Sequence, residues 1–88
     1  MKLIKFEQDN CTPCKMLKNF LEKDLKVEVD ETVNIASGGP EAIQRAVKYG
    51  IMTTPVLLLV DKEGNEIERA AGVGQTKVRN ILAKRGLI

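Results

Sequence analysis

The sequence predicts an α/β domain with the element order β-α-β-α-β-β-α, built as a four-stranded mixed sheet with helices on both faces. Three observations predict it: a strand pattern that runs into a helical pattern near the N-terminus, an unbroken apolar run at residues 56–60, and a strand–turn–strand pattern that begins with that run. The first β-α-β unit should be a right-handed crossover with parallel strands, whereas the closing hairpin must be antiparallel.

In the first half of the chain, strand and helix patterns alternate. Residues 3–7 predict a strand, because apolar side chains are interleaved with lysine. A helix is expected from Pro13, whose missing N–H suits a first helical turn, to about Asp24. One face of this helix carries Met16, Leu17, Phe20 and Leu21. Residues 26–30 alternate charge with valine and predict the second strand. Three further residues either extend that strand or belong to the next loop: Thr32, Val33 and Ile35.

The second half predicts a helix, a hairpin and a last helix. The second helix should begin at Pro40 and end at Gly50, a position suited to a left-handed cap. Its buried stripe is expected to consist of Ile43, Ala46 and Val47. The apolar residues 56–60 suit a buried strand, and residues 66–70 return antiparallel to them after a turn. The last helix should end near Gly86. It is expected to bury Val78, Ile81 and Leu82.

Length and composition indicate one globular domain that spans residues 1–88. Hydrophobic residues make up 43% of the chain and charged ones 30%, a balance typical of soluble globular proteins. Mixed charges with a net charge of +2, together with few aromatic residues, argue against nucleic acid as a partner. The apolar run at 56–60 is far shorter than the roughly 18 residues that a membrane span needs. Because the N-terminus is also too charged for a signal-peptide core, we expect a cytoplasmic protein with no membrane partner, and a monomer.

The two cysteines stand in the segment Cys11-Thr12-Pro13-Cys14, at the junction of the first strand and the first helix. The unpaired N–H groups and the macrodipole of a helix N-terminus favour a thiolate at the first sulfur. Because the thiolate is the attacking species in thiol–disulfide exchange, we expect Cys11 to be the nucleophile. Cys14 follows one helical turn later, close enough to attack a sulfur bound to Cys11, and is expected to be the resolving thiol.

A stabilising disulfide and a zinc site are the other roles that a cysteine pair can have. A disulfide that closes so small a loop adds little stability. Zinc usually takes four ligands, commonly cysteine and histidine, and the chain has two cysteines and no histidine. A zinc site shared by two copies, or one completed by Glu7 or Asp9, stays open as an alternative, but we expect neither a metal nor a cofactor.

In three segments the sequence resembles the thioredoxin family. They are residues 11–15 after a strand, residues 49–59 with Pro55, and the hairpin around residues 62–66 with the later Gly72 and a final helix. The match covers essentially the whole chain but lacks the extra N-terminal strand and helix of full-length thioredoxins, so the chain is similar in size to glutaredoxins. The resemblance implies a thioredoxin-like fold in which Pro55 is a cis proline facing the cysteines. It also implies that the substrate contacts Thr12, Pro13, Thr54 and Pro55. The alternative for Pro55 is a trans proline that merely begins a strand.

Two departures from the family's pattern concern the surroundings of the cysteines. Asn10 stands where thioredoxins usually carry a tryptophan, and Lys5 stands where they place a buried acid that accepts the proton of the resolving thiol. If Lys5 points under the cysteines, Glu7, Asp9 or water must act instead. Alternatively, Lys5 faces outward or pairs with an acid.

The resemblance implies a thiol–disulfide oxidoreductase that reduces disulfide-containing proteins through a mixed disulfide, with a place in electron transport and cell redox homeostasis. Residues 72–76 lack the acid that helps glutaredoxins bind glutathione, and Pro13 directly precedes Cys14 as in thioredoxins. We therefore expect a thioredoxin-reductase-type electron donor rather than glutathione. The alternatives are a glutathione-dependent reductase and a non-enzymatic module that binds a metal or a partner.

Overall fold

The computed structural model describes residues 1–88, and its elements follow one another in the order expected from the sequence. The elements are β1 (Lys2–Glu7), α1 (Thr12–Asn19), the π-helical turn η1 (Phe20–Asp24), β2 (Glu31–Asn34), α2 (Gly39–Lys48), β3 (Val56–Val60), β4 (Glu66–Ala71) and α3 (Gln75–Arg85). The turn η1 continues α1 to Asp24, where the first helix was expected to end.

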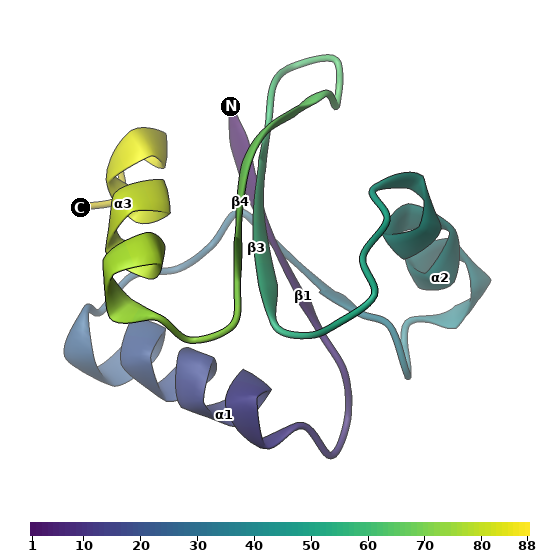
Figure 1. Ribbon diagram of the computed structural model, residues 1–88, viewed down its shortest axis with the longest axis horizontal. Coiled ribbons are helices and arrows are strands. Elements are labelled where there is room, and N and C mark those ends of the chain that lie inside the picture. Colours follow the sequence, from purple (N-terminus) through teal and green to yellow (C-terminus); the bar gives the residue numbers. More distant parts are fainter.

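The four strands form one mixed sheet in the order β2-β1-β3-β4 (Figure 1). Strand β1 pairs with β2 in parallel, with Ile4 opposite Glu31, and with β3 in antiparallel orientation. Strand β4 pairs antiparallel with β3, which confirms the predicted hairpin. The predicted crossover connection and mixed sheet are therefore both present.

Helices cover both faces of this sheet, as predicted (Figure 1). Alternate residues of a strand point to opposite faces, so Leu3 of β1 faces one layer while Ile4 and Phe6 face the other. On the Leu3 side, α1 and α3 pack against the sheet, and α3 buries Val78, Ile81 and Leu82 as expected. On the other side α2 packs alone. Strand β3 is buried along its whole length because it lies between two other strands and two helical layers.

The second strand does not lie where the valine alternation placed it. Residues 26–30 form no strand, and β2 begins only at Glu31. Val27 and Val29 nevertheless pack against the core on the α1 side, while the charged residues that alternate with them are exposed. The alternation therefore reflects which side chains are buried, not pairing with a neighbouring strand. The segment meets β1 only at Asp30, whose N–H donates to the Leu3 carbonyl at 3.1 Å.

The buried face of α2 also differs from the expectation. Ala42 and Ala46 pack against the sheet, whereas Ile43 and Val47 are 52% and 73% exposed. The turn that begins the helix is tight: a Cβ added to Gly38 would lie 2.5 Å from the Asn34 carbonyl oxygen and 2.7 Å from the Ala42 Cβ. Two alanines, rather than the larger apolar residues, therefore form the face of α2 that meets the core.

The helix ends agree with the sequence. Pro40 lies in the first turn of α2, and Gly50 follows it with a φ of +64°. Gly86 caps α3 in the left-handed conformation, with a φ of 89°. All the helices are too short or too polar to cross a membrane.

Candidate functional site

The two cysteines lie at the N-terminus of α1 and form a disulfide, with 5.2 Å between their Cα atoms. Cys11 is the N-cap residue, and its Sγ accepts a hydrogen bond from the backbone N–H of Cys14 at 3.2 Å. Asn10 precedes it with a positive φ of 54°, a conformation that asparagine adopts more readily than most residues. The sulfur of Cys11 therefore occupies the position of the side-chain oxygen that usually caps a helix.

Thr54 and Pro55 face the disulfide from the loop that precedes β3. The Sγ of Cys11 lies 3.5 Å from the Thr54 hydroxyl oxygen and 3.9 Å from the Thr54 carbonyl oxygen. The Thr54–Pro55 peptide bond is cis, as the resemblance implies, and the trans alternative is wrong. Pro55 is buried, and its carbonyl accepts the N–H of Gly72 at 2.9 Å. Two segments far apart in the sequence thus meet beside the sulfur of Cys11, and Gly72 is bonded to the second of them.

The predicted site residues differ in exposure. Cys11 and Cys14 are 7% and 6% exposed, whereas Thr12 and Pro13 between them are exposed. The structure therefore brings Cys11, Cys14, Thr54 and Pro55 together. It places Thr12 and Pro13 on the outer side of the turn.

A polar cavity of about 200 Å³ borders both cysteines on the side of β1. It is lined by Glu7, Gln8, Asp9, Asn10, Cys11, Cys14, Lys15, Lys18 and Asn34. Asp9 accepts a hydrogen bond from the Asn34 side-chain amide at 3.0 Å, which ties this loop to the end of β2. Hydrogen bonds from arginine side chains lower the pKa of three carboxyls outside this cavity: Asp30, Glu31 and Glu66.

Lys5 lies within the fold and pairs with an acid. The residue is only 8% exposed, and its Nζ lies 3.3 Å from a carboxylate oxygen of Glu7. Of the interpretations weighed from the sequence, the outward-facing lysine is wrong and the acid-paired one is confirmed. No group of three or more histidine, cysteine or acidic side chains is arranged to hold a metal ion.

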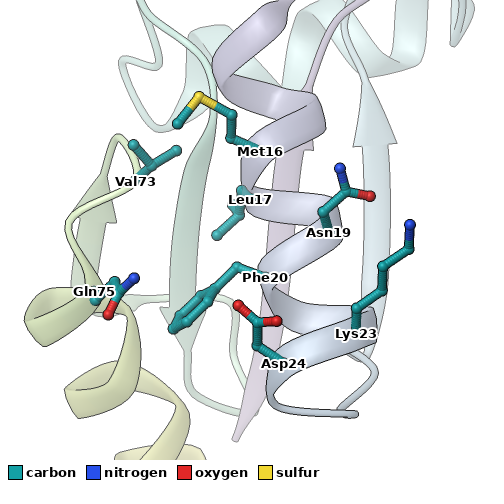
Figure 2. A pocket seen from close by; sticks show the side chains of 8 residues that line it. All are labelled: Met16, Leu17, Asn19, Phe20, Lys23, Asp24, Val73 and Gln75. Atoms are coloured by element: carbon teal, nitrogen blue, oxygen red, sulfur yellow. The ribbon is translucent and has the colours of Figure 1, made fainter.

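A groove of about 360 Å³, lined half by apolar and half by polar side chains, lies between α1 with η1 and the start of α3. Figure 2 shows Met16 and Val73 at one end of it, Phe20 at the start of η1, and Gln75 opposite. Met16 is 54% exposed although it belongs to the apolar face of the predicted helix. The sequence analysis did not predict this groove. Its only sequence signal is the apolar Val73 between two glycines, which places a side chain opposite the helix.

The hydrogen bond from Gly72 to the Pro55 carbonyl brings the chain after β4 into backbone contact with the loop that carries the cis proline. The need for glycine has another cause. Gly72 has a φ of +86°, and a Cβ added to it would meet nothing within 4 Å. Conformation rather than space therefore calls for glycine at this position.

Known proteins resemble this chain over most of its length. A family model described as a thioredoxin-like domain matches residues 2–84. The SPbeta prophage-derived thioredoxin-like protein YosR of Bacillus subtilis (strain 168) is 38% identical over 82 residues, which are 93% of this chain and 95% of that protein. The mitochondrial Thioredoxin-2 of Schizosaccharomyces pombe is 34% identical over 82 residues, which are 93% of this chain but only 60% of that protein.

Solved thioredoxin structures agree with the fold. The thioredoxin Mala s 13 of Malassezia sympodialis superposes with a TM-score of 0.71 at 25% identity, covering 93% of this chain and 71% of that one. The thioredoxin NaTrxh of Nicotiana alata gives a TM-score of 0.67 at 27% identity, covering 94% and 72%. With its close cysteine pair, the chain is a thiol–disulfide oxidoreductase and belongs to the thioredoxin-like family.

Proposed function

We propose that this protein reduces disulfides in other proteins, with Cys11 as the nucleophile and Cys14 as the resolving thiol. The observation that carries the proposal is the position of the Cys11 sulfur, which caps α1 and faces Thr54 and the cis Pro55. In the reduced protein, the N–H of Cys14 and the other unpaired N–H groups of the first turn favour a thiolate at Cys11.

The order of attack follows from these contacts. The exposed fractions of the two cysteines, 7% and 6%, do not distinguish them. Their positions in the helix do distinguish them. A thiolate at Cys11 is stabilised by the unpaired N–H groups at the N-terminus of α1, whereas Cys14 lies one turn inside the helix. Cys11 is therefore the better nucleophile toward an incoming disulfide.

The reaction runs in two exchanges. The Cys11 thiolate attacks one sulfur of the substrate disulfide, a mixed disulfide forms, and the other substrate sulfur leaves as a thiolate. Cys14 then loses its proton and attacks the Cys11 sulfur, which forms the Cys11–Cys14 bond and releases the second substrate thiolate. The substrate gains two electrons, and the protein ends in the disulfide state that the structure shows.

The surface around the sulfurs supports a protein as the substrate. Met16 on α1 is 54% exposed and Met52, two residues before Thr54, is 94% exposed. Flexible apolar side chains of this kind adapt to varied partner surfaces. The segment after β4 carries Gly72 and Gly74 but no acid, which supports a reductase rather than glutathione as the electron donor. A reductant of this kind works in a reducing compartment, and we place it in the cytoplasm.

Trapping tests the roles of the two cysteines. Cys14→Ser should form a stable mixed disulfide with a disulfide-containing protein such as insulin, visible by mass spectrometry and reversed by dithiothreitol. Cys11→Ser, the matched control, should form none and should lack reductase activity. Failure of Cys14→Ser to trap substrate, or equal trapping by both variants, would contradict the assignment.

The direction of electron flow is tested by the reduction potential of the pair, measured in graded thiol–disulfide buffers with alkylation. A value of about −270 to −200 mV is expected for a reductant, in the range from thioredoxin to glutaredoxin. A value near −120 mV would instead make the protein an oxidant. Absence of a reversible two-electron couple would favour the non-enzymatic binding module.

A further inference from the structure

An ion pair between a buried lysine and a partly buried glutamate lies on the same face of the sheet as the cysteine helix. Leu3 of β1 packs against Leu17 and Leu21 of α1 and η1, so the face of β1 that carries Leu3 is the one under the cysteine helix. The two-residue period of a strand puts Lys5 and Glu7 on that face as well. The Lys5 side chain is 10% exposed and that of Glu7 is 26% exposed. The pair therefore lies largely out of solvent and beneath the helix that begins with the cysteines.

Glu7, rather than Lys5, borders the cysteines. Glu7 ends β1 and lines the polar cavity together with Cys11 and Cys14. Lys5 lies two residues back along the strand, about 7 Å away in the strand direction, and lines a different cavity. The lysine thus reaches the site only through its contact with Glu7.

The charged groups around Glu7 can be named from each element that packs there. They are Lys5 on β1, Asp9 in the following loop, and Lys15 and Lys18 on α1. Strand β2 contributes the uncharged Asn34, and β3 contributes the apolar Leu57 opposite Lys5. Beyond Lys5, the second cavity is lined by Glu22 and Glu28. Asp9 is exposed and already bound to Asn34, so Glu7 is the one carboxylate of the cavity that is both partly buried and fixed by a cation.

The second exchange needs a proton acceptor. Cys14 is 6% exposed and must lose its proton before it can attack Cys11. We propose that Glu7 accepts this proton, directly or through an intervening water, and that Lys5 is a positioning residue that holds the Glu7 carboxylate at the cavity. This assignment rests on the proposed reductase function and names a further residue for it.

The proton and the electron pair balance in this step. The proton of the Cys14 thiol passes to the Glu7 carboxylate, and the Cys14 sulfur bonds to the Cys11 sulfur. The bond from Cys11 to the substrate sulfur breaks, and the substrate leaves as a thiolate with the bonding electron pair. Glu7 then returns its proton to the leaving thiolate or to water.

Stopped-flow exchange with an aromatic disulfide that releases a coloured thiolate separates the two steps. The first release reports attack by Cys11, and the second reports attack by Cys14 on the mixed disulfide. In Glu7→Gln we expect an unchanged first release and a second release slowed about tenfold near pH 6. The difference should shrink toward about pH 8.5, where hydroxide alone ionises an ordinary thiol. Asp9→Asn removes the other carboxylate of the cavity and should leave both releases unchanged.

A second pair of variants guards against misfolding. Because Glu7→Gln leaves Lys5 buried without its partner, the double variant Lys5→Met with Glu7→Gln removes both charges and should show the same slow second release. Glu7→Asp keeps a carboxylate and should recover part of the rate. A second release that matches the wild type at every pH in both Gln-containing variants would overturn the assignment, and so would equal slowing by Asp9→Asn. If the wild-type protein released no coloured thiolate in the first step, the proposed reductase function itself would be overturned.

Discussion

Glu31 joins three elements of the fold, and its replacement has a stability effect that depends on pH. Its carboxylate receives two hydrogen bonds from Arg45 of α2, one of them at 3.0 Å, and lies 2.5 Å from the Nζ of Lys2 on β1. Strand β2 is four residues long and pairs only with β1, so this cluster adds to the anchoring that the buried Val33 provides. We predict that Glu31→Gln destabilises the protein at neutral pH and much less in acid.

The magnitude follows from the ionisation of this carboxyl. Hydrogen bonds from Arg45 and Lys2 lower the pKa of Glu31 from 4.5 to about 2. Taken alone, that difference corresponds to roughly 3 kcal/mol. Because 30% of the side chain is open to solvent, screening reduces this figure, and exposed ion pairs contribute about 0.2–1 kcal/mol each. With two cationic partners, we expect Glu31→Gln to cost about 1–2 kcal/mol.

The sign of the pH dependence is fixed by the lowered pKa. In acid the folded protein binds fewer protons at Glu31 than the unfolded chain does. The stabilisation by ionised Glu31 is therefore fully present above about pH 4.5 and is lost as the pH falls toward about 2. Urea unfolding of the oxidised protein at about pH 7, 4 and 3 measures it, with an expected midpoint difference of about 1 M at neutral pH. Glu63→Gln, an exposed carboxylate in the β3–β4 turn, is the control and should have little effect. A difference that is absent at neutral pH, or that persists unchanged at about pH 3, would refute the reasoning.

Two further predictions concern the loops at the disulfide. Gly72→Ala should cost about 1 kcal/mol in urea unfolding, because Gly72 has a φ of +86°. Gly74→Ala, with a φ of −61° and no atom within 4 Å of the added Cβ, should be nearly neutral, and equal losses in the two variants would contradict the conformational argument. Thr54→Val should slow the first exchange of Cys11 about threefold, because it removes the hydroxyl that lies 3.5 Å from the sulfur. Thr53→Val is the control in the same stopped-flow assay, and equal first-exchange rates in Thr54→Val and the wild type would show that the hydroxyl does not act on Cys11.

The parts of the fold that the sequence predicted are those with local causes. The run at residues 56–60 is apolar on both faces, as a central strand must be, and it forms β3. The turn after it depends on Asp61, whose carboxylate accepts the backbone N–H groups of Glu63 and Asn65 at 2.9 Å. Such turn chemistry is encoded within a few residues, so the hairpin could be predicted without knowledge of the rest of the chain.

The errors arose where pairing between distant segments decides the structure. Val27 and Val29 alternate with charge as in a strand, but the ladder with β1 begins at Glu31, opposite Ile4. In α2, Ala42 and Ala46 meet the core, and which face does so depends on how the helix packs against distant strands, which no pattern within the helix reveals. Because isoleucine and valine are more hydrophobic than alanine, the sequence pattern predicted burial of the face with Ile43 and Val47, which is exposed.

For the site, the sequence predicted the positions of the cysteine pair and of the cis proline better than their surroundings. Cysteine at a helix start and proline before a strand restrict the chain locally, so Cys11, Cys14 and Pro55 could be assigned from their spacing and resemblance. The contact from Gly72 to Pro55 depends on the register of β3 against β4, in which Val56 lies opposite Ala71. The groove lined by Met16, Phe20 and Val73 depends on how the first and last helices pack side by side, which no single segment encodes.

The pair of Lys5 and Glu7 was accessible from the sequence by the same reasoning that predicted β1. Residues two apart on a strand share a face, so a lysine and a glutamate at positions 5 and 7 are neighbours whenever this segment is a strand. Their burial has a thermodynamic consequence. Desolvation offsets much of the attraction in a buried ion pair, and well-packed apolar residues often serve stability as well or better. A charged pair beneath the cysteine helix is therefore poorly explained by stability, whereas a carboxylate held in the cavity that borders Cys14 supplies the base that the second exchange requires.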